Sequence, residues 1–239
     1  MHPPTLTARS RALWAGLAGA PASFGPVLHV AVSPDSRLCP PRWVGIVVIA
    51  DAVIATAPTP GIAHTVQQAL GTLPAASLTD PTMLSTRLQV LEMLGPACLA
   101  YLDPAEFRPH HGQVAIEQLL PHDDDLRQLV RSSSTDDVEE SGITHITSPA
   151  FAVREQGAII SAAGYRDWPG KVAHLSVLTI ATARGRGLAQ AVASAALTHA
   201  IAHGELPQWR ARPQTSRRVA RALGFRELGS QVSIRVAHP

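Results

Sequence analysis

A glycine-rich turn with two arginines, Arg184–Ala189, is the part of the sequence whose residue types and spacing best suit chemistry. It follows the apolar segment Val172–Ile180 and opens the Ala-rich segment Gly187–His203, which we interpret as a strand and a long helix. A glycine-rich turn at a helix N-terminus directs several backbone N–H groups, and the positive end of the helix dipole, at one point. Glycine also removes the Cβ atoms that would keep a phosphate at a distance. The segment therefore predicts a diphosphate cradle.

Two other phosphate-binding motifs do not fit this turn. A Walker loop is excluded because no Gly-Lys-Ser/Thr ending exists. A dinucleotide fingerprint is missing because nothing supplies its third glycine or the acidic residue at the end of the next strand. The remaining alternative is a plain helix start whose glycines serve packing.

Other combinations of reactive residues are weaker. His110, His111 and His122, together with Asp123–Asp125, lack the spacing of metal ligands, so we expect no metal. No elbow motif supports a Ser/His/Asp nucleophile. The string Trp209–Arg212 is one short strand, and the net charge of the chain is only +2. We therefore expect no nucleic-acid partner.

The elements that position the turn follow from residue 113 onward, in the predicted order β-α-α-β-β-β-α-β-α-β-β. Ser134-x-x-Asp137 resembles a capping box and indicates a helix start at Thr135. The carboxylates of Asp123–Asp125 suit the start of the preceding helix, where the dipole favours negative charge. The predicted segments are Val114–Leu120, Leu126–Ser132, Thr135–Ser141, Ala150–Val153, Ala158–Tyr165, Val172–Ile180, Gly187–His203, Leu206–Arg212, Thr215–Leu223, Phe225–Gly229 and Gln231–Ala237.

Residues 1–110 predict a smaller α/β domain without a chemical motif. Thr59-Pro60 and Asp80-Pro81 are N-cap and N1 pairs that open helices, running to Leu70 and to Leu94. A linker with two prolines and a glycine covers residues 103–112, which divides the chain into domains 1–110 and 113–239. The predicted strands are Val27–Val32, Val44–Ala50, Ala52–Ala57 and Ala97–Leu102.

Composition sets broad limits. A chain of 239 residues with 46% hydrophobic and 16% charged residues has ample core material, so extensive disorder is not expected. Cys39 and Cys98 are far apart and are expected to be free, buried thiols. No apolar run reaches the roughly 18 residues of a membrane span. The stretch Ala12–Ala18 imitates a signal peptide but is short and contains glycine, so we interpret it as an amphipathic helix of a cytoplasmic protein.

The sequence from residue 113 onward resembles the GCN5-related N-acetyltransferase (GNAT) superfamily. The family signature Arg/Gln-x-x-Gly-x-Gly/Ala is matched by Arg184, Gly187 and Ala189, and a helix ending in Leu-Gly-Phe is matched by Ser216–Phe225. The predicted element order from residue 113 agrees as well. The resemblance implies an α/β (α+β) GNAT fold, with a mixed central sheet flanked by helices. The smaller α/β domain before it is of unknown role and is also compatible with a degenerate GNAT-like half.

Carried over by position, the resemblance implies acetyl-CoA as the cosubstrate. Backbone groups of the strand Val172–Ile180 would bind the pantetheine arm as an added strand would. The strand Leu206–Arg212 would splay away from it to leave a slot, and the turn would bind the pyrophosphate. The implied cofactor-binding residues are Val177, Leu178, Thr179, Arg184, Gly185, Arg186, Gly187, Leu188, Ala189, Arg217 and Arg218.

The implied reaction is direct attack of an amine on the thioester, with backbone N–H groups of the cofactor strand stabilising the oxyanion. Candidate bases are His174, near where some relatives place a Glu, and Glu139 and Glu140, on the helix that usually walls the acceptor site. A packed histidine and solvated carboxylates are the alternatives. The Tyr that often protonates the leaving thiolate is replaced by Ala220, and the Asn that often opens that helix is replaced by Pro213-Gln214.

Two functions follow from the resemblance. The first is an acetyl-CoA-dependent N-acyltransferase whose acceptor is an amine of a small molecule or of a protein. The second is a catalytically inactive coenzyme A-binding sensor or scaffold module, which the missing Tyr favours. We expect neither nucleic acid nor membrane as a partner, and a homodimer stays open.

Overall fold

The computed structural model describes residues 4–19, 22–110, 112 and 114–237, and the chain forms two compact units. The first unit combines residues 1–99 with residues 227–239, and the second unit spans residues 100–226. The end of the chain therefore belongs to the unit that its beginning forms. The division into domains 1–110 and 113–239 stays a prediction.

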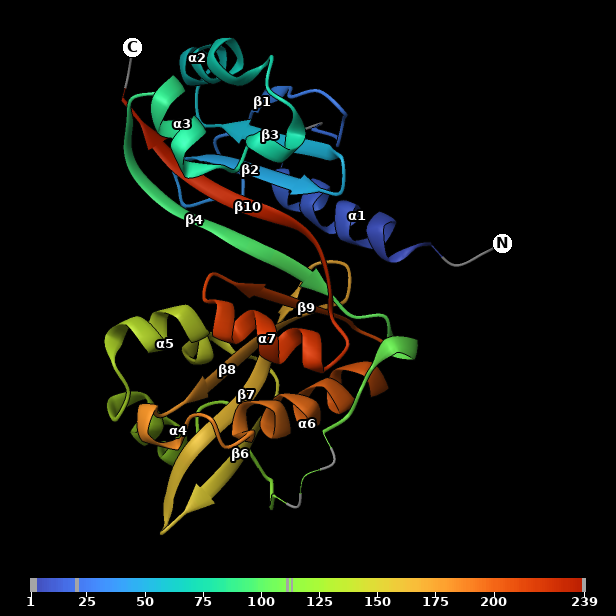
Figure 1. Ribbon diagram of the computed structural model, residues 1–239, viewed down its shortest axis with the longest axis vertical. Coiled ribbons are helices and arrows are strands. Elements are labelled where there is room, and N and C mark those ends of the chain that lie inside the picture. Colours follow the sequence, from blue (N-terminus) through green and yellow to red (C-terminus); the bar gives the residue numbers. More distant parts are fainter. Residues whose placement is uncertain (1–3, 20–21, 111, 113, 238–239) are drawn as a thin grey trace. The chain divides into compact units, whose positions relative to one another are not determined.

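The first unit places its strands in the order β1-β3-β2-β10, followed by β4. β2 and β3 form an antiparallel hairpin, β10 is antiparallel to β2, and β1 is parallel to β3 (Figure 1). Every residue of β2 and β3 is buried, which explains their continuous apolar sequences. The elements are α1 (Leu6–Ala18), β1 (Val30–Val32), β2 (Val44–Ile49), β3 (Ala52–Ala57), α2 (Pro60–Leu70), α3 (Pro81–Arg87), β4 (Val90–Tyr101) and β10 (Arg226–Val236), with a short 3-10 helix Ala75–Ser77.

Two predictions in this unit are wrong. The helix expected from Asp80-Pro81 to Leu94 ends at Arg87, and β4 then begins at Val90 and continues through Gly95-Pro96. Pairing beside β10 overrides the local helical pattern, and the N–H of Ala237 donates to the carbonyl of Gln89 at 3.1 Å. The two strands expected at the C-terminus are the single strand β10, which pairs with β2 without interruption from Gly229 to Ile234.

The second unit orders its strands β9-β8-β7-β6-β5, with the last residues of β4 next to β9. The β5–β6, β6–β7 and β7–β8 pairs are antiparallel, whereas β8 and β9 are parallel. The elements are β5 (Glu117–Leu119), α4 (Asp124–Arg131), α5 (Thr135–Ser141), β6 (Ala150–Glu155), β7 (Ala158–Trp168), β8 (Val172–Thr179), α6 (Leu188–Ala202), β9 (Leu206–Ala211) and α7 (Gln214–Ala222), with 3-10 helices Pro104–Glu106, Ile143–His145 and Ala181–Ala183. The mixed sheet flanked by helices is the expected fold class.

The Ala-rich helix α6 is buried along most of its length against β6, β7 and β8 (Figure 1). Ala191, Ala193, Ala196 and Ala200 are at most 2% exposed. Such small side chains let the helix approach the sheet closely, as its composition predicted. A second apolar cluster joins α4 and the 3-10 helix Ile143–His145 to the sheet. The two clusters include alternate residues of β8, so the helices lie on opposite faces of this strand.

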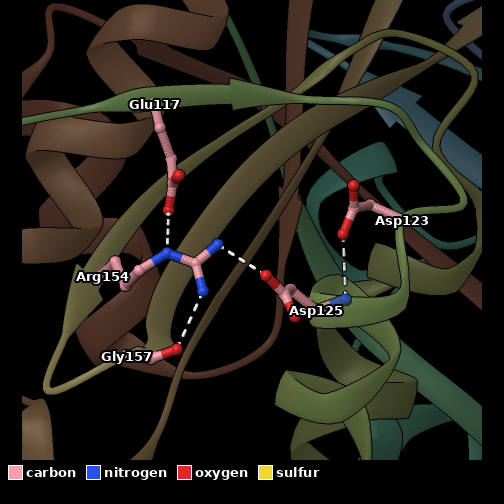
Figure 2. Close-up of polar contacts among 5 residues, drawn as sticks. All are labelled: Glu117, Asp123, Asp125, Arg154 and Gly157. Atoms are coloured by element: carbon pink, nitrogen blue, oxygen red, sulfur yellow. Dashed lines mark hydrogen bonds and ion pairs between the residues drawn. The ribbon is translucent and has the colours of Figure 1, made fainter.

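The acidic run Asp123–Asp125 has a structural role at the start of α4. Figure 2 shows the Asp123 carboxylate accepting the N–H of Asp125 at 2.9 Å, which confirms the expected helix start. In the same view the Arg154 guanidinium on β6 binds Glu117 at 2.8 Å, Asp125 at 2.6 Å and the carbonyl of Gly157 at 2.8 Å. One arginine thus ties β5, α4 and the β6–β7 turn together.

Steric constraints require the glycine of the Leu-Gly-Phe block after α7. Gly224 has φ 99°, a conformation that L side chains rarely adopt. A Cβ atom there would also overlap the backbone carbonyl of Glu106. The glycine therefore permits the chain to leave α7 directly beneath the 3-10 helix Pro104–Glu106.

Two expectations from composition concern the thiols and membrane spans. Cys39 and Cys98 are free, as expected, but both are only half-buried. Burial still raises the pKa of the Cys39 thiol to about 12, which keeps it protonated. Across the part of the chain that the structure describes, no helix has both the length and the apolar character needed to cross a membrane.

Candidate cofactor and acceptor site

The second unit contains a cavity of about 700 Å³. Its walls come from α5, β8, the turn before α6, the first residues of α6, β9 and α7. Its apolar lining residues include Leu175, Val177, Leu188 and Trp209. Arg184 and Arg218 line it from the turn and from α7. A mostly apolar pocket with a few charged groups is typical of a small-molecule site.

The cavity follows the gap between β8 and β9. These strands pair only from Val172 opposite Leu206 to His174 opposite Gln208, although β8 continues to Thr179 and β9 to Ala211. Beyond His174 the strands part, as the resemblance predicted.

Strand alternation decides which backbone groups of β8 face this gap. The N–H of Ile180 donates to Ile160 on the β7 side, so Leu178, two residues earlier, also directs its backbone groups toward β7. The backbone groups of Val177 and Thr179 point the other way, toward the gap. Leu178 still contributes to the cavity wall.

The turn expected to bind a diphosphate has the geometry of a cradle. Gly185 and Gly187 have φ values of 79° and 77°, and Gly187 caps the 15-residue helix α6 without a side-chain hydrogen bond. The first backbone N–H groups of a helix have no partner inside it. Gly185, Gly187, Leu188 and Ala189 all line the cavity. These N–H groups and the helix dipole therefore suit an anion at the wide end of the gap.

The arginines assigned to the cofactor differ in position. Arg184 lines the cavity and binds the Asp137 carboxylate on α5 at 2.7 Å. Arg186 binds Glu155 through two nitrogens at 2.7 and 3.0 Å, and is not among the lining residues. Arg218 lines the cavity, whereas its neighbour Arg217 does not. The structure thus brings Arg184 and Arg218 to the cavity.

His174 lies where β8 and β9 separate, but its surroundings oppose protonation. Its ring stacks on Trp168, with centroids 4.4 Å apart, and its Nδ1 lies 2.5 Å from Oε1 of Gln208. An amide oxygen only accepts, so Nδ1 carries the proton. Burial, with Arg210 and Arg166 nearby, lowers the pKa of His174 to about 3. The imidazole is neutral at pH 7 and is a weak base.

The two glutamates named as candidate bases lie differently on α5. Glu140 lines the cavity, whereas Glu139 is exposed and outside the lining. The Glu140 carboxylate accepts the backbone N–H of Arg212 at 3.0 Å and its Nε–H at 2.5 Å. These bonds tie α5 to the end of β9.

Several lining residues have no sequence signal that marks them. Trp209 is 5% exposed and donates its indole N–H to Ser216 Oγ at 2.9 Å, so both are held at the wall formed by β9 and α7. Ala220 is 2% exposed and packs in the core, so it supplies no proton donor. Asp137 showed only its capping role in the sequence. Its partner Arg184 is far away along the chain, and only the fold reveals the pair.

No metal-type cluster is found in the described ranges. Within them, no group of three or more His, Cys, Asp or Glu side chains is arranged to hold a metal ion. His111 of the histidine-rich linker lies outside the described residues. Asp123, Asp124 and Asp125 are each committed to a cap or an ion pair.

Comparisons with known proteins agree with this geometry. The family model described as GNAT acetyltransferase matches residues 147–230. A GCN5-related N-acetyltransferase from Kribbella flavida is similar in structure, with a TM-score of 0.52 and 15% identity over 79% of this chain and 88% of that chain. A search of the curated proteins found no match.

Two further solved structures are similar over a smaller part. One is a GNAT-family protein from Novosphingobium aromaticivorans, with 21% identity, a TM-score of 0.49, and coverage of 61% of this chain and 65% of that chain. The other is a GCN5-related N-acetyltransferase-like protein from Streptococcus suis, with 18% identity, a TM-score of 0.44, and coverage of 60% of this chain and 61% of that chain. The alignments thus span less than two thirds of both proteins. The resemblance of the C-terminal half to the GNAT superfamily is confirmed by the family model, and the fold by the Kribbella flavida structure.

Proposed function

We propose that this GNAT-like chain is an acetyl-CoA-dependent N-acyltransferase that transfers an acetyl group to an amine by direct attack. The observation that carries the proposal is the continuity of the cavity. It begins where β8 parts from β9 and reaches the glycine turn at the start of α6. An open strand edge followed by an anion-binding turn matches a ligand with an amide-rich arm and a diphosphate. The GNAT family match supports the same ligand class.

The residues present fit coenzyme A. Gly185 and Gly187, both with positive φ, carry no side chains that would cover the N–H groups of the turn. A Cβ atom on Gly185 would meet no atom within 4 Å, so the space above it is open. The turn from Arg184 to Ala189 would hold the pyrophosphate, with Arg218 adding charge from α7. The backbone of Val177 and Thr179 would bind the pantetheine arm.

When bound, acetyl-CoA supplies an activated acetyl group as a thioester. The chain's own task is to orient the amine and to accept its proton. Of the three candidate bases, we assign this role to Glu140, because it lines the cavity whereas Glu139 and His174 do not. Its bonds to Arg212 fix the carboxylate in place. A weak base suffices here, since an attacking nitrogen becomes acidic as it gains positive charge.

A coenzyme A-binding sensor or scaffold is the second candidate function. The buried Ala220 favours it, because a leaving thiolate would receive no proton from that position. Both functions require the same cavity, so they differ in turnover and not in binding.

Calorimetry with coenzyme A, followed by thiol release from acetyl-CoA against a panel of small amines and peptides, separates the two. The enzyme predicts binding and turnover above the rate without acceptor. The sensor predicts binding alone. Absence of binding would contradict both. Replacing Gly187 with leucine should abolish binding in either case, and unchanged affinity would refute the cradle.

A further inference from the structure

Asp137 forms an ion pair with Arg184, the arginine of the glycine turn that lines the cavity. Its Oδ1 lies 2.7 Å from Nη2 of Arg184, and both residues line the cavity. The other carboxylate oxygen accepts the hydroxyl of Ser134 at 2.5 Å. These two hydrogen bonds lower the pKa of Asp137, so the side chain is an anion at neutral pH.

The neighbouring ion pair offers a natural comparison. Arg186, two residues along the same turn, binds Glu155 on β6, and neither residue lines the cavity. Both ion pairs join a turn arginine to a carboxylate, and all four side chains are partly exposed, between 35% and 51%. They differ in whether a ligand in the cavity can reach them.

We propose that the Asp137 carboxylate competes with a ligand phosphate for Arg184, so that anion binding at the turn exchanges a carboxylate for a phosphate. The proposal rests on the proposed function, which supplies the diphosphate. Before binding, the carboxylate neutralises Arg184 inside the cavity. When a diphosphate enters, Arg184 cannot satisfy both anions with full strength, and two like charges in one cavity repel.

The exchange has a consequence for the acceptor side. Asp137 and Glu140 lie on the same short helix, α5, within one turn of each other. Asp137 ties α5 to the cradle, and Glu140 ties it to Arg212 at the end of β9. Release of Asp137 removes one of these two ties. Occupation of the cradle is thereby linked to the position of the helix that carries the assigned base.

The test is the affinity of the whole chain for two probes, coenzyme A and inorganic pyrophosphate, measured by calorimetry. Asp137→Asn removes the charge and keeps the helix cap, in which the backbone N–H of residue 137 donates to Ser134 Oγ. An exposed ion pair contributes up to about 1 kcal/mol, so we expect both probes to bind about fivefold more tightly. Glu155→Gln is the matched control and should leave both affinities unchanged. Asp137→Ser gives a second variant in case the amide disturbs α5.

The outcomes separate this proposal from the proposed function. Unchanged or weaker binding by both Asp137 variants, with wild-type affinity intact, overturns the competitor and leaves the proposed function standing. An equal gain in the Glu155→Gln control also overturns it. If Asp137→Asn brings the same fivefold gain when Arg184 is already glutamine, the carboxylate does not act through Arg184 and the proposal fails. Binding of neither probe by any variant overturns both proposals.

Discussion

Gly187→Ala and Gly170→Ala form a matched pair that isolates the cradle. Both glycines have φ 77°, so a Cβ atom strains both backbones equally. An added Cβ meets nothing within 4 Å at Gly170, and only the His110 ring, at 3.6 Å, at Gly187. The left-handed conformation costs a non-glycine residue about 1–2 kcal/mol. Each variant should therefore lower the melting temperature by about 2–8 °C.

Only Gly187 lines the cavity, so only its replacement should weaken coenzyme A binding. A shifted turn loses at least one hydrogen bond from a backbone N–H to a charged phosphate, and such a bond contributes about 1.5–3 kcal/mol. The expected loss of affinity is about 10- to 150-fold for Gly187→Ala, against none for Gly170→Ala. Calorimetry measures the affinity, and circular dichroism measures the melting temperature. Equal affinities in two variants of equal stability would refute the assignment of the turn.

Three further variants test the structure around the site. Gly224→Ala should lower the free energy of unfolding by about 2 kcal/mol or more, because strain at φ 99° combines with overlap of the Glu106 carbonyl. The control Gly157→Ala, at φ 83° and in open space, should show the strain alone. Equal losses in urea unfolding would contradict the clash. The folded pKa of His174 lies below its ordinary value of 6.5, so the unfolded chain binds more protons between these values, and stability present above pH 6.5 is lost as the pH falls. Wild type should lose about 1 kcal/mol more than His174→Gln between pH 7 and pH 5.5 in urea unfolding, and parallel pH profiles would argue against a buried neutral imidazole. Arg154→Gln should lower the urea midpoint only slightly, since the pairs in Figure 2 are partly exposed, and should leave coenzyme A affinity unchanged. A large change in affinity would mean that the network shapes the cradle.

The cradle could be predicted because its determinants are local. A strand, two glycines and a helix start occupy one continuous stretch, and their backbone geometry follows from residue type. The same holds for α5, whose Ser134 cap accepts the N–H of Asp137 as the capping-box pattern indicated. It holds for α2, where Thr59 accepts the N–H of Ile62. Elements whose ends are fixed by their own side chains are the ones that sequence patterns describe well.

Elements fixed by distant partners could not be predicted in this way. The first residues of β4 were expected to be helical. Their pairing beside β10 joins residues more than 130 positions apart in the chain, which no local pattern reveals. The ion pair of Asp137 with Arg184 and the link from Glu140 to Arg212 likewise join α5 to segments far along the sequence. Nothing in the local pattern marks these partners, since a solvated carboxylate and a paired one have the same neighbours in sequence.

Cofactor binding and catalysis place different demands on the sequence. Phosphate binding needs only backbone N–H groups and a dipole, which the turn supplies whatever the rest of the fold does. Proton transfer needs a side chain at one position with a suitable pKa. Here the imidazole at the strand separation has a pKa of about 3, and the carboxylate at the cavity wall is bound to Arg212. Because Arg212 lies beside the Glu140 carboxylate, an acceptor with an anionic group near its amine could pair with Arg212 while its amine meets Glu140, so the thiol-release panel should include amines with and without such a group.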